Sequence, residues 1–400
     1  MPHSDRNCPG PPGSTVADAK ANDLPMIDPL QLDGAEAVAD MIDKVYARSG
    51  FNARRLAEAA HLYKRMLDSN TTVCLTLAGA MTPIGMSGVL NTLIRAGFID
   101  CIISTGANLY HDLHRPFSQP MMQGHFAVDD NELADTGIAR IYDVFIEDED
   151  TLMATDRIIL DAMERVDHSR PLSTATLHAA LGKEIQETAD RSDWSLLATA
   201  AEMEVPIYTS SPGDSSIAMN LTVPHLFGER IPLDPLKDVI ETAAIVRAAE
   251  TNGVIICGGG SPKNFYLQTQ PTLHQIFMDE TPVGHDYVIQ LSTDAPHWGG
   301  LSGATPQEAR SWGKVRDAFV DNVVVYSCAS ITLPLLAQYV LVRNQPRPLK
   351  RLYGRLEELS DALKESARGN KRFHKSLDDL VDRYKGLAPE PSRSPSRSET

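Results

Sequence analysis

The stretch Val254-Ile255-Ile256-Cys257-Gly258-Gly259-Gly260-Ser261-Pro262-Lys263-Asn264 predicts a buried strand that turns directly into a helix. Residues 253–257 are apolar and rich in β-branched side chains, as in strands that are buried on both faces. The three glycines allow a tight turn and a close approach of the backbone to a ligand, and Ser261 and Pro262 are favourable residues at a helix start. Because a helix N-terminus favours a pyrophosphate, the turn is either a simple strand-to-helix connection or part of a nucleotide site.

Similar apolar runs recur along the chain and alternate with longer segments that have helical periodicity. This alternation predicts a Rossmann-like α/β fold in which one mostly parallel sheet is covered by helices. Ligands of such folds bind at the carboxyl ends of the strands, and small-residue segments follow most of the predicted strands. The predicted strands cover residues 72–78, 101–104, 205–208, 253–257, 287–292 and 322–326, and the predicted helices include 86–96, 235–251 and 261–278.

The composition is that of one large globular domain with two unstructured ends. Of the 400 residues, 42% are hydrophobic and 22% are charged, which is ordinary for a globular protein. Residues 1–25 and 387–400 lack core-forming residues and are predicted to be a disordered arm and a disordered tail, which leaves residues 26–386 as a single domain. Spaced leucines between residues 351 and 385 predict two amphipathic helices that pack on the core or on a neighbouring subunit.

The net charge and the cysteines limit which partners and which cellular compartment are expected. A formal charge of −16 at pH 7 argues against nucleic acid or an anionic membrane as a partner, and it suits a cationic substrate. No apolar run approaches the ~20 residues of a membrane span, and the first residues lack the apolar segment of a signal peptide. The five cysteines include no C-x-x-C pair and lie mostly in apolar contexts, which is typical of reduced thiols in a cytoplasmic protein.

The strongest chemical signal is Ser311-Trp312-Gly313-Lys314, which follows a loop of small residues that ends at Glu308. A lysine beside an aromatic wall can lose solvation, and burial disfavours the charged ammonium and lowers the pKa. The neutral amine can then attack carbonyls and imines and form covalent intermediates. On the tetrapeptide alone, a surface lysine beside a buried tryptophan is the commoner outcome.

These segments resemble the deoxyhypusine synthase family, in which a Ser-Trp-Gly-Lys lysine takes an aminobutyl group from an imine that is generated with NAD. The Gly-rich turn after Cys257, the turn within residues 102–108, and Pro212-Gly213-Asp214 also match family segments, in family order. The resemblance implies a Rossmann-like fold, bound NAD, small-molecule amine substrates and a homotetramer.

The resemblance implies an NAD site that is built from small residues at several strand ends. No G-x-G-x-x-G fingerprint is present, and the ribose-binding acid that usually follows it is missing, so the dinucleotide site is atypical. The implied cofactor contacts are Thr82, Ser87, Thr105, Gly106, Ala107, Gly259, Thr293, Asp294, Cys328 and Ala329.

The implied amine site keeps only part of the family pattern. Asn264 stands where the family has a histidine, His111 where it has a glutamate, and Leu301 where it has an acid; Cys328 and Thr209 replace aspartates that contact NAD. A charge-assisted hydrogen bond contributes ~1.5–3 kcal/mol, so the altered site is expected to take a different amine. These substitutions resemble the bacterial deoxyhypusine synthase-like branch, some members of which make polyamines such as homospermidine. The implied catalytic residue is Lys314, and the implied substrate-binding residues are Asp214, Glu308, Trp312, Asn264, His111 and Ser302.

Three functions remain open at this stage. The first is NAD-dependent transfer of an aminobutyl group between polyamines through an imine on Lys314, similar to homospermidine synthesis. The second is deoxyhypusine synthesis on a protein lysine. The third is a non-catalytic protein that binds NAD or an amine, because several carboxylates of the family are missing.

Two further motifs carry weaker signals. His111-Asp112-Leu113-His114 places two histidines three residues apart, a spacing that can hold a metal on a helix, but no H-E-x-x-H pattern or partner carboxylate accompanies it, so no metal site is predicted. The acidic run Glu147-Asp148-Glu149-Asp150 predicts a solvated loop or a helix start.

Overall fold

The computed structural model describes residues 36–379 apart from 230, 318–320, 373 and 376–377, and side chains are not described at 36 and 148–150. The arm predicted at 1–25, the tail predicted at 387–400 and both boundaries of the domain predicted at 26–386 lie outside these residues.

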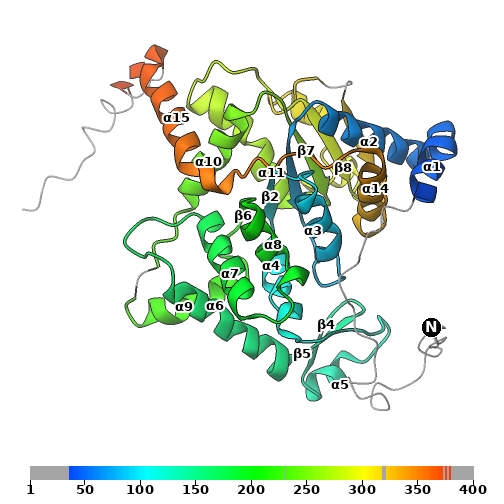
Figure 1. Cartoon of the computed structure of the whole chain (residues 1–400), viewed down its shortest axis with the longest axis vertical. Coiled ribbons are helices and arrows are strands. Elements are labelled where there is room, and N and C mark those ends of the chain that lie inside the picture. The colour runs from blue at the N-terminus through cyan, green and yellow to red at the C-terminus, as the bar shows by residue number, and fades with distance from the viewer. Residues whose placement is uncertain (1–35, 230, 318–320, 373, 376–377, 380–400) are drawn as a thin grey trace, which may run out of the picture.

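A six-stranded parallel sheet forms the centre of the molecule, which confirms the predicted α/β class (Figure 1). The strands lie in the order β6-β2-β1-β7-β8-β9, so the chain first builds outward from β1 and then returns to its other side. The topological switch point is therefore between β1 and β7, where such folds bind ligands. The bounds are β1 Thr72–Leu77, β2 Cys101–Ser104, β6 Ile207–Thr209, β7 Asn252–Cys257, β8 Tyr287–Leu291 and β9 Asn322–Val325.

The apolar runs of the sequence arise because both faces of this sheet are covered. Along β1 every residue is buried, with Val73 and Leu75 in one apolar cluster and Cys74 in a second cluster. Successive side chains of a strand point to opposite faces, so a strand with two covered faces needs an unbroken apolar sequence.

Helices cover the sheet on both sides, and several pairs lie together. The helix α10 packs along α15, and α2 packs along α14 (Figure 1). Within the part of the chain that the structure describes, each helix is too short or too polar to span a bilayer. The α-helices are α1 Glu36–Lys44, α2 Phe51–Asp68, α3 Ser87–Arg95, α4 Gly106–Asp112, α5 Asp130–Asp135, α6 Ala154–Glu164, α7 Thr174–Thr188, α8 Leu196–Met203, α9 Ser216–Leu226, α10 Pro235–Ala248, α11 Gly260–Leu267, α12 Thr269–Pro271, α13 Pro306–Arg310, α14 Ala329–Arg343 and α15 Leu356–Gly369.

Two elements differ from the sequence predictions. A small antiparallel sheet with the strand order β3-β5-β4 was not predicted; its strands are β3 Met121–Gln123, β4 Ile138–Ile141 and β5 Val144–Glu147. The predicted helix 261–278 is broken into α11, α12 and a π-helix at Thr272–Ile276, because Pro271 cannot donate the backbone hydrogen bond that would continue it. The acidic run predicted as a loop or helix start begins a π-helix at Asp148–Met153.

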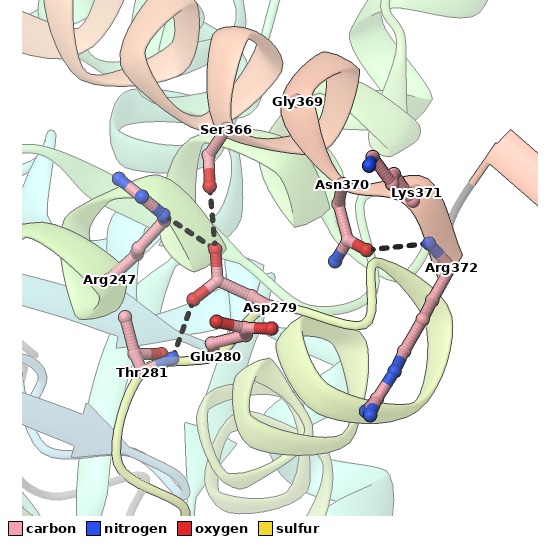
Figure 2. Close-up of a pocket in the computed structure, with 9 residues that line it drawn as sticks. All are labelled: Arg247, Asp279, Glu280, Thr281, Ser366, Gly369, Asn370, Lys371 and Arg372. Carbon is pink, nitrogen blue, oxygen red and sulfur yellow. Dashed lines mark hydrogen bonds and ion pairs between the residues drawn. The ribbon is translucent and has the colours of Figure 1, made fainter.

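The first of the two predicted C-terminal helices is α15, and its Leu356, Leu359 and Leu363 are buried. Its end is attached by polar contacts around a pocket of about 630 Å³ (Figure 2). There Asp279 accepts hydrogen bonds from Nε of Arg247 at 2.7 Å and from Oγ of Ser366 at 3.2 Å. The leucines of the second predicted helix lie mainly outside the described residues.

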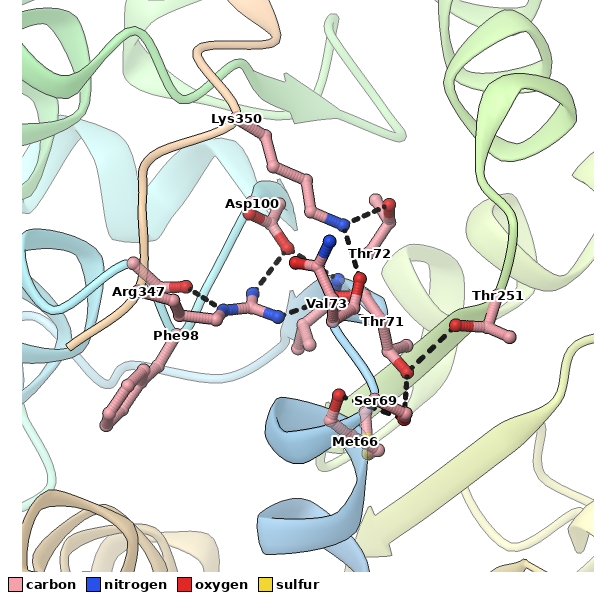
Figure 3. Close-up of polar contacts among 12 residues, drawn as sticks. Met66, Ser69, Thr71, Thr72, Val73, Phe98, Asp100, Thr251, Arg347 and Lys350 are labelled. Carbon is pink, nitrogen blue, oxygen red and sulfur yellow. Dashed lines mark hydrogen bonds and ion pairs between the residues drawn. The ribbon is translucent and has the colours of Figure 1, made fainter. Parts of the chain in front are cut away.

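The amino end of the sheet is closed by the segment that follows α14. Arg347 donates to the carboxylate of Asp100 at 2.7 Å and to the carbonyl of Thr71 at 2.8 Å, and Lys350 donates to Oγ1 of Thr72 at 2.8 Å (Figure 3). Asp100 also accepts from the backbone N–H of Val73 at 2.9 Å. Burial raises the pKa of Asp100, so the carboxylate depends on these donors.

Candidate active site

Backbone hydrogen bonds fix the position of Lys314 after α13. The N–H of Lys314 donates to the carbonyl of Ala309 at 3.1 Å, and its own carbonyl accepts from the N–H of His285 at 3.0 Å. Gly313 has a φ of +68°, which a glycine adopts without strain, so the chain can turn between the helix and the lysine. His285 is fully buried and stacks on Tyr266 at a centroid distance of 4.5 Å, which makes this anchor rigid.

The amine of Lys314 lies in a half-buried position against the middle of α11. Its Nζ donates to Oδ1 of Asn264 at 2.9 Å. Burial lowers the pKa of Lys314, and the nearby carboxylate of Glu308 partly opposes that shift. A larger fraction of neutral, nucleophilic amine results than in a free lysine.

Trp312 flanks this amine but does not bury it. The ring centroid lies 5.9 Å from Nζ of Lys314, within the range of a cation–π contact, yet the tryptophan is 69% exposed. The aromatic group predicted beside Lys314 is therefore present but largely exposed in a single chain, so it contributes little to the burial of the amine.

Lys263 is a functional candidate that the sequence analysis did not identify. It is buried, and its Nζ donates to Oε1 of Gln290 at 3.2 Å, to the carbonyl of Leu301 at 3.3 Å and to the carbonyl of Ala304. Burial lowers the pKa of Lys263 to about 8, and Glu308 opposes the shift. The loop before α13 is thus tied to α11 and β8. The sequence did contain an indication that Lys263 is buried: it precedes Tyr266 by three residues, so the two side chains lie on the same, buried face of the helix.

The Gly-rich turns allow the loops of the site to touch each other. A Cβ on Gly259 would lie 2.5 Å from Cα of Ser302, so only glycine fits there. Ser302 is held from the other side, because its carbonyl accepts from Nε2 of Gln290 at 2.7 Å. A Cβ on Gly106 would lie 2.3 Å from Cβ of Ser215, which places the turn after β2 against the residue that follows Asp214.

Asn108 joins the turns after β1 and β2. Its Oδ1 accepts from the N–H of Met81 at 2.8 Å, its Nδ2 donates to Oγ1 of Thr105 at 2.9 Å, and its carbonyl accepts from Oγ1 of Thr82 at 2.6 Å. Thr82 is fully buried, so its hydroxyl supports the turn from within. Sequence reasoning did not single out Asn108, although it lies within the matched turn.

The switch point has the features that a dinucleotide needs. Gly79, which follows β1, has a φ of +76°, and a Cβ there would meet no atom within 4 Å, so the backbone faces open space. Gly258 follows the neighbouring strand β7, and a Cβ on it would lie 3.3 Å from the Cβ of Ala78. Thr293 is exposed and Asp294 half-buried at the end of β8, where the carboxylate is available to accept hydrogen bonds from hydroxyl groups.

The remaining sequence-predicted residues lie in the segments that follow the strands. Ser87 is buried at the start of α3, and Ala107 is exposed on α4. Cys328 is exposed, and Ala329 begins α14 after β9. Thr209, which stands where the family has an aspartate, is buried at the end of β6.

Two groups of substrate-binding candidates result. Lys314, Asn264, Glu308, Trp312 and Ser302 gather on the β7–β8 side. Asp214 is exposed and His111 half-buried, and both follow strands on the β2–β6 side. A hydrogen bond of 3.2 Å between the hydroxyls of Ser211 and Ser261 joins the two sides.

The histidine motif on α4 has a structural explanation. Nδ1 of His111 lies 3.0 Å from Nε2 of His114, so the two rings bind each other. Asp112 caps α8, where its carboxylate accepts from Oγ of Ser195 at 2.6 Å and from the N–H groups of Leu196 and Leu197. Among the described residues, no group of three or more His, Cys, Asp or Glu side chains could hold a metal ion.

Comparisons with known proteins agree with this architecture. The fold resembles that of a solved putative deoxyhypusine synthase from Entamoeba histolytica, with a TM-score of 0.51 over 76% of this chain and 94% of the other, at 16% identity. At that identity the likeness shows the fold alone.

Sequence relatives go further. A deoxyhypusine synthase-like protein from a Cyanothece strain is 46% identical over 342 residues, which cover 82% of this chain and 84% of the relative. A probable deoxyhypusine synthase 2 from Methanosarcina acetivorans is 38% identical over 79% of this chain and 89% of the relative. The family model of deoxyhypusine synthase matches residues 40–340. The chain therefore belongs to the deoxyhypusine synthase family, whose members are aminobutyl transferases.

Proposed function

We propose that the protein transfers an aminobutyl group between small amines through a covalent imine on Lys314, as in homospermidine synthesis. The observation that carries this proposal is the half-buried amine of Lys314, which has a lowered pKa and lies against Asn264, Glu308 and Trp312.

The chain's own residues account for the transfer steps. Neutral Lys314 attacks the imine carbon of the bound donor, a C–N bond forms to Nζ, the bond to the donor nitrogen breaks, and the two hydrogens that Nζ loses pass to the departing amine. The acceptor amine then attacks the lysine imine and releases Lys314 in the same balanced way. Bound NAD would supply the redox chemistry, with a hydride accepted from the donor carbon and given back to the final imine, so that no net oxidation would occur.

We propose that NAD binds across the switch point, where Gly79 leaves open space beside the backbone. Asp294 is the acceptor for ribose hydroxyls in this arrangement, and Thr82 and Ser87 support the turn from within. The proposed contacts are Thr82, Ser87, Thr105, Gly106, Ala107, Gly259, Thr293, Asp294, Cys328 and Ala329.

We propose that the amine lies between the two groups of substrate-binding candidates. Asp214 and Glu308 anchor ammonium groups, Trp312 provides a cation–π face, and Asn264, His111 and Ser302 complete the pocket. An altered amine substrate is favoured because Asn264, His111 and Leu301 stand where the family resemblance would place a histidine, a glutamate and an acid.

Deoxyhypusine synthesis on a protein lysine is the second candidate. It is favoured by the identity of 38–40% to archaeal proteins that are named probable deoxyhypusine synthases. A non-catalytic role loses its support, because the chain belongs to a family of transferases and keeps a half-buried Lys314.

A homo-oligomer, expected to be a tetramer, is part of the proposal. Trp298 is 73% exposed and Trp312 is 69% exposed beside the site, and large aromatic surfaces of this kind are commonly covered by another subunit. Light scattering of the full chain tests this point: a monomer at micromolar concentration would contradict it.

The decisive experiment is incubation of the full chain with NAD⁺ and a panel of diamines and polyamines, followed by borohydride reduction and mass spectrometry. Transfer between amines should give a new polyamine, and reduction should leave an aminobutyl adduct on Lys314. A parallel reaction with a hypusine-site peptide or protein distinguishes the second candidate. No adduct and no product with any acceptor would contradict both.

A further inference from the structure

A chain of hydrogen-bonded side chains leads from the interior of the domain to His111. Nδ1 of His111 lies 3.0 Å from Nε2 of His114, and Nδ1 of His114 lies 2.7 Å from Oγ1 of Thr155 on α6. His114 and Thr155 are fully buried, whereas His111 is half-buried. The chain therefore ends at a half-buried ring in the last turn of α4, the helix that follows β2.

The buried end sets the direction of these hydrogen bonds. Oγ1 of Thr155 lies 2.8 Å from the carbonyl of Thr151 and 2.7 Å from Oε1 of Gln119, and both oxygens are acceptors. The hydroxyl has only one hydrogen, which points to one of them. Toward His114, the hydroxyl oxygen must therefore accept, and Nδ1 of His114 must carry a hydrogen.

The state of the two rings follows from their burial. Burial lowers the pKa of His114 well below its usual range, so the ring is neutral and its Nε2 is an acceptor. Nδ1 of His111 must then donate to it. Burial, and next the charge of Arg115, lower the pKa of His111 to about 4, so this ring is neutral at pH 7 as well. Its second nitrogen, Nε2, carries no hydrogen.

We propose that His114 and Thr155 hold His111 in the Nδ1–H tautomer, so that its bare Nε2 accepts a hydrogen bond from an N–H group of the amine substrate. The substrate half of this inference rests on the proposed function, and the tautomer half does not. His111 follows the exposed Ala107 by four residues on α4, so both lie on one helix face beside the site.

This arrangement gives His111 a role in specificity. A nitrogen that can only accept favours a donor group such as an amine and disfavours a carbonyl or carboxylate in the same place. Because the acceptor is neutral, it contributes less to ammonium binding than a carboxylate would, which agrees with an altered amine. Among the described residues, no protein group bonds to Nε2 of His111, so the nitrogen is available.

Nitrogen-15 NMR of the histidine-labelled full chain at pH 7 tests the tautomer. His111→Asn identifies the signals of His111, because the asparagine amide can still donate to His114. We expect a protonated Nδ1 and an unprotonated Nε2 in His111. A proton on Nε2 of His111 overturns the proposal. Addition of NAD⁺ and 1,4-diaminobutane should shift the Nε2 resonance, and an active enzyme in which it does not move also overturns the acceptor role.

Substitutions at Thr155 test the chain through kinetics. Thr155→Val removes the oxygen that accepts from His114, so the tautomer preference should weaken and the amine KM should rise about two- to tenfold, the effect of one neutral hydrogen bond. Thr155→Ser keeps the hydroxyl and should behave like the parent. Equal KM values for the valine and serine variants overturn the link between Thr155 and the substrate.

The two halves fail in distinguishable ways. If the protein transfers no aminobutyl group and binds no amine, the proposed function and the acceptor role fail together, while the NMR tautomer is still measured. If transfer proceeds but His111 has the Nε2–H tautomer, only the present inference fails. His111→Gln, which can place an acceptor near the former Nε2, should retain more amine affinity than His111→Asn, and the reverse order contradicts the acceptor role.

Discussion

The two ends of the central sheet use buried cations in opposite ways. At the amino end, Arg347 and Lys350 each donate to several oxygens, and Asp100 supplies a buried counter-charge (Figure 3). At the carboxyl end, Lys314 donates to one neutral amide oxygen, Oδ1 of Asn264, among the described residues. Burial lowers the pKa of Lys350 as well as that of Lys314, so the difference lies in the partners: several bonds hold a cation in place, whereas the singly bonded amine of Lys314 can reach a substrate.

Lys263 shows that the carboxyl end needs both kinds of lysine. It lies one residue before Asn264, yet it is buried and bonded to three oxygens, two of which belong to the loop that precedes α13. Its neighbour in space, Lys314, is held mainly by its backbone. One lysine positions the loop, and the other is left to react.

The largest effect is expected at the reactive lysine. Lys314→Arg should abolish transfer, because arginine keeps a charge but stays protonated and cannot form the imine. The assay is product formation with the amine panel, together with the mass of the borohydride-reduced protein. Lys364→Arg on the exposed face of α15 is the matched control and should be fully active. Product formation at the parental rate by Lys314→Arg would rule out the covalent route.

At the amino end of the sheet, replacement of a buried cation should lower the stability of the fold and leave the transfer reaction intact. Arg347→Met removes the only cation that is hydrogen-bonded to the buried Asp100 among the described residues, and breaking such a pair on one side costs about 3–5 kcal/mol in the free energy of unfolding. Urea unfolding measures this loss. Arg351→Met removes an exposed pair with Glu204 and should change stability by less than about 1 kcal/mol. Similar losses in the two variants would contradict the difference in burial.

Most of the central sheet could be predicted from the sequence, for a physical reason. Strands covered on both faces must be apolar at every position, so β1, β2 and β7 stand out as apolar runs, and the turns after them were correctly placed. The small sheet of β3, β5 and β4 was missed because its strands have three or four residues and include polar or exposed positions.

The polar interior was harder to infer from sequence. Lys263 is satisfied by carbonyls 38 and 41 residues away, and Arg347 by a carboxylate 247 residues away. No local pattern encodes such pairings, because only the fold brings the partners together. For the same reason, the Ser-Trp-Gly-Lys segment predicted a lysine with a lowered pKa, but it did not reveal that Trp312 stays exposed and that Asn264 contacts the amine.

Lys263→Met tests the positioning role of the second lysine. The carbonyls of Leu301 and Ala304 would lose their donor, and a displacement of the loop by about 1 Å can lower the rate about a hundredfold. We expect kcat to fall while the reduced protein still carries an adduct on Lys314. Lys263→Arg, which keeps the cation, should retain more activity. If kcat is unchanged in Lys263→Met, the loop does not depend on this lysine.

Asp214→Asn tests the anchor on the other side of the site. Loss of a charge-assisted hydrogen bond of ~1.5–3 kcal/mol should raise the amine KM about tenfold or more, with a smaller change in kcat. Asp190→Asn, at another exposed position, serves as the control and should have parental kinetics. Unchanged kinetics of Asp214→Asn across the amine panel would mean that the substrate site does not extend to this residue.

The smallest expected effect concerns the balance between burial and charge at Lys314. Burial lowers the pKa of Lys314 and Glu308 raises it again, so Glu308→Gln should lower that pKa further. The reactive form of the lysine is neutral and becomes more abundant as the pH rises through its pKa. The ascending limb of kcat against pH should therefore move to lower pH in Glu308→Gln, whereas Glu308→Asp, which keeps the charge, should stay closer to the parent.

Because Glu308 is also a proposed ammonium anchor, the amine KM should rise, and kcat must be measured at saturating amine. A limb that stays in place or moves to higher pH would show that Glu308 does not act on the protonation of Lys314, and the contrast between the two ends of the sheet would then rest on burial alone.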